Sequence, residues 1–166
     1  MRCEITREFS DEHRQHLTAW RERVFPEEGV GKQWAETAWH ILVYDTPALP
    51  IAHLGFDRFL LNADGVDQAV IGVGGVVVRP EYQGQGVPDL LFDTLHREAP
   101  DLCNTHAFAL FCPERLVSYY LRHGYTPVAG EVFFQQFGQQ VRSRFELMTY
   151  GVELGSARVD INSLPW

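Results

Sequence analysis

Cysteine, basic side chains and long apolar runs are all scarce in this 166-residue chain. The three cysteines, Cys3, Cys103 and Cys112, are odd in number and have no metal-ligand spacing, so we expect neither a disulfide framework nor a bound metal. No apolar run approaches the roughly 20 residues of a membrane-spanning helix. The first residues, Met1 to Glu4, also lack the apolar core of a signal peptide. These absences predict a cytoplasmic protein with no membrane partner.

Basic residues number 14 against 22 acidic ones, which gives a formal net charge of −8. Neutralising nucleic-acid phosphates requires a basic face, so the balance argues against a nucleic-acid partner and favours a cationic small molecule. The length and the 45% hydrophobic content predict one domain over residues 1–166, large enough to fold without staples.

The most informative segment is the change from an apolar run to a glycine-rich loop and then to an amphipathic stretch. Val76, Val77 and Val78 end the apolar run at Arg79-Pro80, and Gln83-Gly84-Gln85-Gly86-Val87-Pro88 follows. Pro88 stands where the first turn of a helix tolerates a missing N–H. Glycines beside a helix N-terminus let an anion approach unpaired N–H groups, so the segment predicts a phosphate-binding loop.

The remaining pattern predicts a mixed α/β chain. We expect helices over Asp11–Phe25, Lys32–Thr37, a stretch from the loop to about Glu98 before Pro100, and Pro113–His123. We expect strands over Trp39–Asp45, Ile51–Leu61, Val66–Val78, His106–Cys112, Pro127–Gln136 and Phe145–Glu153, with a hairpin turn at Asn62–Gly65.

The loop Gln83-Gly84-Gln85-Gly86 resembles the Q/R-x-x-G-x-G/A loop of the GNAT (GCN5-related) N-acetyltransferases, with Pro88 where that family usually has glycine or alanine. The resemblance implies the GNAT fold, a mixed and mostly antiparallel sheet of about six to seven strands with helices on both faces and a cleft where strands 4 and 5 splay apart. It implies acetyl-CoA as cofactor. The implied contacts are residues 76–79 and 83–87, with Val76, Val77 and Val78 offering main-chain amides, Arg79 neutralising phosphate, and Gln83, Gly84, Gln85, Gly86 and Val87 holding the pyrophosphate.

A second motif, Tyr119-Tyr120-Leu121-Arg122-His123-Gly124-Tyr125, resembles the GNAT helix that ends in aromatic-Tyr-x-x-x-Gly-aromatic. Tyr120 matches the tyrosine that protonates the departing CoA thiolate in many members, a role a phenol can fill when it is well placed. No cysteine lies in a context that favours a covalent acyl-enzyme, so we expect direct attack by the amine.

Three features resemble the aminoglycoside 2'-N-acetyltransferases: the segment Ile51 to Arg58, the strand Val73 to Arg79 and the terminal tryptophan. The Ala-His-x-Gly-x-x-Arg part of the first segment also resembles the nodulation acyltransferases. Two acidic residues of the aminoglycoside enzymes are replaced here by Gly74 and Leu164, so the general base stays open. His53 is our candidate base because histidine titrates near neutrality. Asp57, Glu27, Glu28 and Trp166 are candidate acceptor-binding residues, with Glu36 as a further carboxylate.

The sequence thus predicts an N-acetyltransferase that moves an acetyl group from acetyl-CoA to a primary amine of a small molecule. Two alternatives remain: transfer of a longer acyl chain, and a GNAT-like module that binds acyl-CoA without turnover. A homodimer is possible because the family often dimerises through its C-terminal strands.

Overall fold

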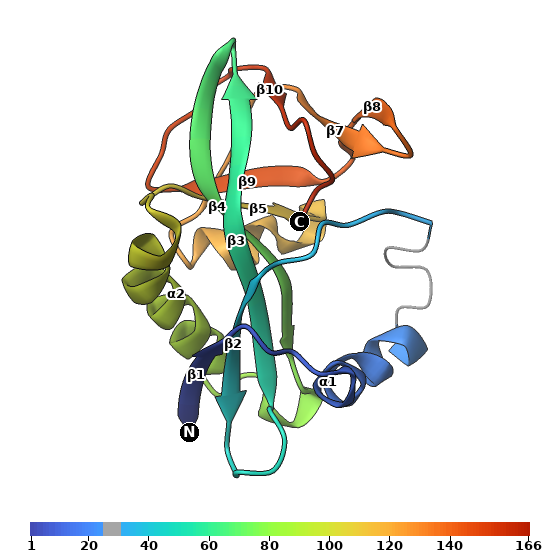
Figure 1. Cartoon of the computed structure of the whole chain (residues 1–166), viewed down its shortest axis with the longest axis vertical. Helices are drawn as coiled ribbons and strands as arrows, with labels where there is room; N and C mark the ends of the chain where they lie inside the picture. The colour runs from blue at the N-terminus through green and yellow to red at the C-terminus, as the bar shows by residue number, and fades with distance from the viewer. Residues whose placement is uncertain (25–30) are drawn as a thin grey trace.

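The computed structural model describes residues 1–24 and 31–166, which form one twisted sheet with helices on both faces (Figure 1). The strands run β1 Arg2–Thr6, β2 Trp39–Tyr44, β3 Ala52–Ala63, β4 Val66–Val78, β5 Phe108–Cys112, β6 Thr126–Pro127, β7 Val132–Gln136, β8 Gln139–Arg142, β9 Glu146–Tyr150 and β10 Val159–Asp160. The helices are α1 Asp11–Val24, α2 Val87–Cys103 and α3 Val117–Leu121, with short 3-10 turns η1 Pro80–Tyr82 and η2 Glu114–Leu116. Pairing follows the order β6-β9-β5-β4-β3-β10-β7-β8, and β1 and β2 extend the sheet from β3.

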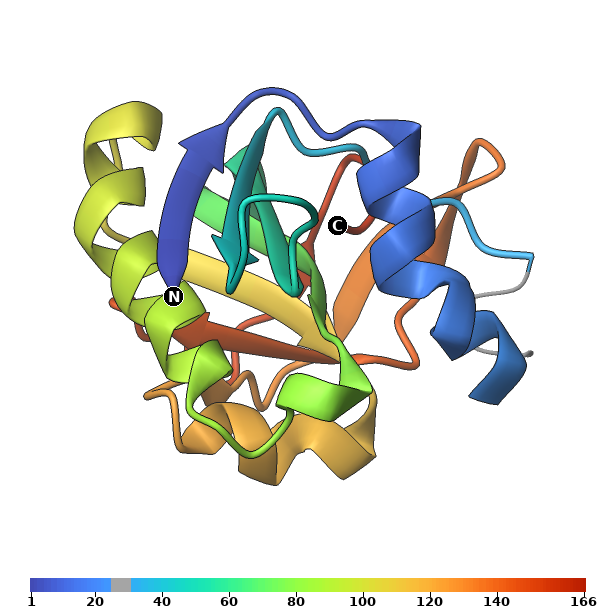
Figure 2. The same ribbon diagram turned by 90° about the horizontal axis from the view of Figure 1, so that it is seen from below.

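Alternation along β2 divides the side chains between the two faces of the sheet. Ile41 and Val43 pack into the apolar cluster that contains α2, whereas Leu42 and Tyr44 pack with Leu17 of α1. Figure 2 shows α1 and α2 on opposite sides of the sheet. The Ser10 hydroxyl starts α1 by accepting the His13 amide hydrogen at 3.1 Å, as an N-cap residue does.

The parallel pair β4 and β5 separates near the middle of β4. Residues Ile71, Gly72 and Val73 pair with β5, and no later residue of β4 does. At the same level the β3–β4 register shifts between His53 and Gly55, and Gly75 adopts a positive φ of 61°. This bulge turns the last part of β4 away from β5, so the sheet opens at the carboxyl ends of β4 and β5, where ligands bind in open α/β sheets.

The mixed, mostly antiparallel sheet predicted from the sequence is confirmed, with ten strands in place of six to seven because several short strands add to it. The predicted helix over Lys32–Thr37 is wrong. Its backbone instead bonds to distant partners: Ala35 N–H to the Pro165 carbonyl at 2.7 Å and Gln33 N–H to Gln136 at 2.9 Å. These long-range hydrogen bonds replace the local ones a helix would make.

Three boundaries also differ from the predicted ones. Helix α2 continues through Pro100 to Cys103, because Ala99, Pro100 and Cys103 are buried against the sheet and this burial offsets the hydrogen bond that proline removes. The strand expected over Pro127–Gln136 is two strands, β6 and β7, and the Pro113–His123 helix is a 3-10 turn followed by the short α3. Within the described ranges, no helix combines the length and apolar character needed to cross a membrane.

Candidate active site

The glycine loop between β4 and α2 presents a row of unpaired amides. Gly84 and Gly86 have positive φ angles of 74° and 76°, and Gly86 lies immediately before the first residue of α2. Within the described chain, no hydrogen bond uses the backbone N–H groups of residues 84–87, and the first helical bond runs from the Leu90 amide to the Gly86 carbonyl at 3.3 Å. Pro88 removes one further donor. The turn and the α2 N-terminus thus present unpaired amides of the kind that suit an anion.

The polar side chains of this loop bond to the loop itself. Gln83 donates to the Val78 carbonyl at 3.1 Å and Gln85 to the Glu81 carbonyl at 2.8 Å, so both fix the shape of the turn. Arg79 pairs with Glu81 and also donates to the His16 carbonyl of α1 at 3.3 Å. These side chains leave the open side of the loop to main-chain atoms.

The end of β4 offers further amides toward the gap left by β5. The Arg79 amide donates to the Ile51 carbonyl beside β3 at 2.9 Å. Because successive N–H groups of a strand point to opposite edges, the Val77 amide also faces β3, and the amides of Val76 and Val78 face the gap. The two amides could therefore bind a carbonyl or amide group that lies between the strands.

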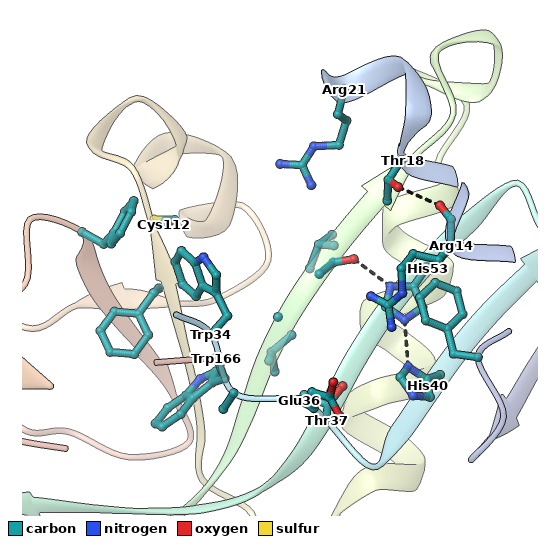
Figure 3. A pocket seen from close by; sticks show the side chains of 18 of the residues that line it. Arg14, Thr18, Arg21, Trp34, Glu36, Thr37, His40, His53, Cys112 and Trp166 are labelled. Carbon is teal, nitrogen blue, oxygen red and sulfur yellow. Dashed lines mark hydrogen bonds between the residues drawn. The ribbon is translucent and has the colours of Figure 1, made fainter. Parts of the chain in front are cut away.

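A cavity of about 1110 Å³ occupies this opening (Figure 3). Its floor is β4 from Val73 to Val76, one wall comes from α1 and the segment before it, and the other comes from β5, α3, residues 34–38 and Trp166. In Figure 3, Arg14, Arg21 and the two histidines lie on the α1 side, and Trp34 and Trp166 lie across from Arg21. The cavity is large enough for a drug-sized molecule.

Tyr120 reaches the cavity from α3, and only 7% of its surface is exposed. Burial, followed by the nearby Tyr119 and Cys112, raises the pKa of Tyr120 well above its ordinary value, so the phenol stays protonated. Its hydroxyl has no hydrogen-bond partner among the described residues. Tyr120 is therefore a buried, neutral phenol whose O–H has no acceptor within the described part of the chain.

Cys112 lines the same wall but is poorly suited to nucleophilic chemistry. Its thiol donates to the sulfur of Met148 at 3.6 Å, and burial raises the pKa of Cys112 to about 11. A thiol in this state is almost entirely protonated at neutral pH and is a poor nucleophile.

His53 and His40 form a hydrogen-bonded chain on the α1 face of the sheet. His53 Nδ1 lies 2.8 Å from the Gly75 carbonyl, and His53 Nε2 lies 2.9 Å from His40 Nδ1. Phe9 stacks on the His53 ring with centroids 4.1 Å apart. Burial lowers the pKa of His53 to about 4, and burial followed by the charge of Arg14 lowers the pKa of His40.

The hydrogen-bond acceptors determine where the protons lie on the two histidines. A carbonyl only accepts, so His53 Nδ1 carries the hydrogen and the neutral ring offers Nε2 as an acceptor for His40 Nδ1–H. His40 is then left with Nε2 as an acceptor, on a residue that lines the cavity. Sequence reasoning selected His53 and missed His40, although both lie on one face of paired strands.

Trp166 fills the space beside two glycines of β4. Its indole stacks on Phe59 with centroids 4.4 Å apart and donates to the Ala109 carbonyl at 3.0 Å. A Cβ on Gly72 would lie 2.6 Å from the indole, and one on Gly74 would lie 2.8 Å from the Trp166 backbone. The two glycines are therefore required by the close approach of this residue.

The carboxylates predicted to bind the amine acceptor do not all lie at the cavity. Asp57 accepts the Ala38 amide hydrogen at 3.1 Å and does not line the cavity. Glu27 and Glu28 lie outside the described residues. Glu36 lines the cavity, as do three arginines that sequence reasoning missed, Arg7, Arg14 and Arg21. Among the residues described, no group of three or more His, Cys, Asp or Glu could hold a metal ion.

Comparison with solved structures assigns the fold to a known class. The chain has the fold of the GNAT N-acetyltransferases. It is similar to an acyl-CoA N-acyltransferase from Pseudomonas aeruginosa (18% identity, 90% of this chain and 99% of that one, TM-score 0.59). It is also similar to Escherichia coli ElaA (17% identity, 90% of this chain and 98% of that one, TM-score 0.59). A third similar structure is a Brucella melitensis GNAT family acetyltransferase in complex with acetyl-CoA (14% identity, 97% of this chain and 96% of that one, TM-score 0.57).

Comparisons by sequence give no further assignment. No family model matches the chain, and no curated protein matches it. At these identities the structural likeness establishes the fold, and the activity must be argued from the residues of the site.

Proposed function

We propose that this protein is an acyl-CoA-dependent N-acyltransferase that transfers an acetyl group to the amine of a small molecule by direct attack. The observation that carries the proposal is the opening between β4 and β5, which has the free amides of residues 84–87 beyond its end and the buried Tyr120 phenol on its wall. A GNAT-fold neighbour crystallised with acetyl-CoA supports the same donor.

The loop fits the pyrophosphate of CoA chemically. Main-chain N–H groups and the α2 N-terminus would hold the phosphates, and Gln83 and Gln85 would keep the turn open. The amides of Val76 and Val78 would bind the pantetheine arm or polarise the thioester carbonyl, a preorganised contribution to catalysis. The thioester would then lie at the cavity.

The transfer itself needs few side chains. The neutral amine attacks the thioester carbonyl, the new C–N bond forms, and the C–S bond breaks. Tyr120 then donates its proton to the departing sulfur, and the amine loses its extra proton to water or to His40 Nε2. His53 supports His40 and the Gly75 bulge, which favours a positioning role for His53 over direct proton transfer.

A covalent acyl-enzyme has no suitable nucleophile, because the Cys112 thiol is buried and protonated. Two alternatives differ from this proposal in the parts of the site that they use. Transfer of a longer acyl chain would need part of the same cavity for that chain. A module that binds acyl-CoA without turnover would use the loop but not Tyr120.

One assay distinguishes these functions. Release of free CoA thiol is followed with acetyl-CoA and with octanoyl-CoA against a panel of amines, and binding of both donors is measured by calorimetry. An acetyltransferase binds acetyl-CoA and releases thiol only when an amine is present. Binding without release for every amine favours the non-catalytic module, and no binding at millimolar acetyl-CoA contradicts both.

A further inference from the structure

The acceptor side of the cavity has a charge opposite to that of the whole protein. The chain carries a net charge of −8, yet Arg7, Arg14 and Arg21 line the cavity, and Glu36 is the one acidic side chain among the described lining residues. The two histidines beside them are neutral at pH 7, because burial lowers the pKa of each. The lining therefore favours an anion over the cation that overall composition suggested.

Two of these arginines are fixed on one wall by the helix. Arg14 and Arg21 are seven residues apart in α1, which is two turns or about 10 Å, so both project from the same face. Burial raises the pKa of Tyr120 and the charge of Arg21 opposes this rise, whereas the charge of Arg14 adds to the fall that burial causes in the pKa of both histidines. The positive charges thus lie beside the groups that would carry out the transfer.

Aromatic stacking holds Arg14 and Arg7 and leaves their N–H donors available. The guanidinium carbon of Arg14 lies 4.8 Å from the Phe9 ring centroid, and that of Arg7 lies 4.5 Å from the Trp39 ring centroid. Stacking occupies the flat face of a guanidinium, whereas hydrogen bonds form at its edge. Among the described residues, neither side chain forms an ion pair or a hydrogen bond.

We propose that the acceptor is an amine that also carries an anionic group, a carboxylate or a phosphonate, and that Arg14, with Arg21 and Arg7 beside it, binds this group. A planar guanidinium edge matches both groups in geometry and charge. The inference rests on the proposed acyl transfer and names its substrate class: amino acids or aminoalkyl phosphonates, as opposed to polyamines or aminoglycosides.

The test compares acceptors that differ only in the anionic group. Thiol release from acetyl-CoA is measured with L-amino acids and their carboxamides, with aminoalkyl phosphonates, and with spermidine and kanamycin. The amine of a carboxamide is less basic than that of its amino acid, so intrinsic reactivity at neutral pH favours the amide. A higher rate with the amino acid than with its carboxamide therefore reports binding of the carboxylate.

The variant Arg14→Gln removes the charge and retains a helix-forming side chain. We expect the KM for the anionic acceptor to rise about 10- to 100-fold, the usual loss for a charged hydrogen bond. The KM for acetyl-CoA should stay unchanged. Arg14→Lys should recover part of the loss. The control is Arg97→Gln: Arg97 lies on α2 outside the cavity lining and, within the described ranges, pairs with Glu98, so this variant should behave as wild type.

The possible outcomes separate this inference from the proposed function. If carboxamides, spermidine or kanamycin release thiol and the anionic acceptors do not, the inference is overturned and the proposed acyl transfer still holds. An Arg14→Gln variant that raises the KM for acetyl-CoA instead assigns the arginine to the donor and also overturns it. If acetyl-CoA binds but no amine releases thiol, both the proposed function and this inference are overturned.

Discussion

Tyr120→Phe is the substitution that most directly tests the proposed chemistry, because it removes one hydroxyl and leaves the packing intact. The phenol is buried in the main apolar cluster, where its ring makes an edge contact with Phe92 at 6.0 Å between centroids. Its hydroxyl has no partner within the described residues, so no donor or acceptor is left unsatisfied when it is removed. We expect the free energy of unfolding to change by less than about 0.5 kcal/mol, or about 2 °C in Tm.

The effect on rate should be much larger. A positioned general acid contributes roughly 10²- to 10⁴-fold, so we expect kcat to fall by at least about 100-fold. The dissociation constant of acetyl-CoA should change less than about two-fold, because the proposed donor site consists of loop amides. Thiol release at saturating amine gives kcat, calorimetry gives the affinity, and a thermal melt gives Tm.

Tyr119→Phe provides the matched control. Tyr119 is adjacent on the same helix, its pKa is also raised by burial, and it does not line the cavity. Its loss should leave kcat within about two-fold of wild type. If Tyr120→Phe retained the wild-type kcat, or if both variants lost activity equally, the assignment of Tyr120 as the acid would be refuted.

Three further predictions concern the neighbourhood of the site. The pKa of His53 is about 4 when folded and 6.5 when unfolded, so stability should fall by about 3 kcal/mol as the pH drops from 6.5 to 4. His53→Gln, which can keep both hydrogen bonds, should flatten this fall in urea unfolding series at several pH values, and an unchanged slope would exclude His53. Gly72→Ala should lower Tm by roughly 3–10 °C and alter Trp166 fluorescence, since its Cβ would overlap the indole; an unaltered melt would show that the indole can move. Asp89→Asn removes a carboxylate from the first turn of α2 and should tighten acetyl-CoA binding about two- to five-fold by calorimetry; weaker binding would show that Asp89 assists the ligand.

Local signals in the sequence predicted the elements whose stabilising residues lie within the same short segment. The Gly84 and Gly86 turn, Pro88 in the first turn of α2 and the Ser10 cap of α1 all act within a few residues, so the loop and both long helices were predictable. The valine-rich end of β4 is equally local. The position of the glycine turn follows from these segments, and the GNAT fold was implied by the resemblance of the loop and of the Tyr119–Tyr125 motif to that family.

The cavity lining was not predictable in the same way, because its residues come from segments that meet only in the folded chain. Arg14 and Glu36 are ordinary surface types in the sequence, and Asp57 seemed equally eligible. The seven-residue spacing of Arg14 and Arg21 was the one available signal, and it shows a shared helix face without showing what that face adjoins.

The sequence alone determined the α/β class of fold and the glycine turn before α2, since hydrophobic patterning and short-range backbone preferences specify them. The tertiary structure decided which charges surround the cavity, which histidine nitrogen is available and which glycines admit Trp166. These properties depend on distances between β4, α1 and residues 34–38, and such distances are set by packing of the whole sheet rather than by any local run of residues.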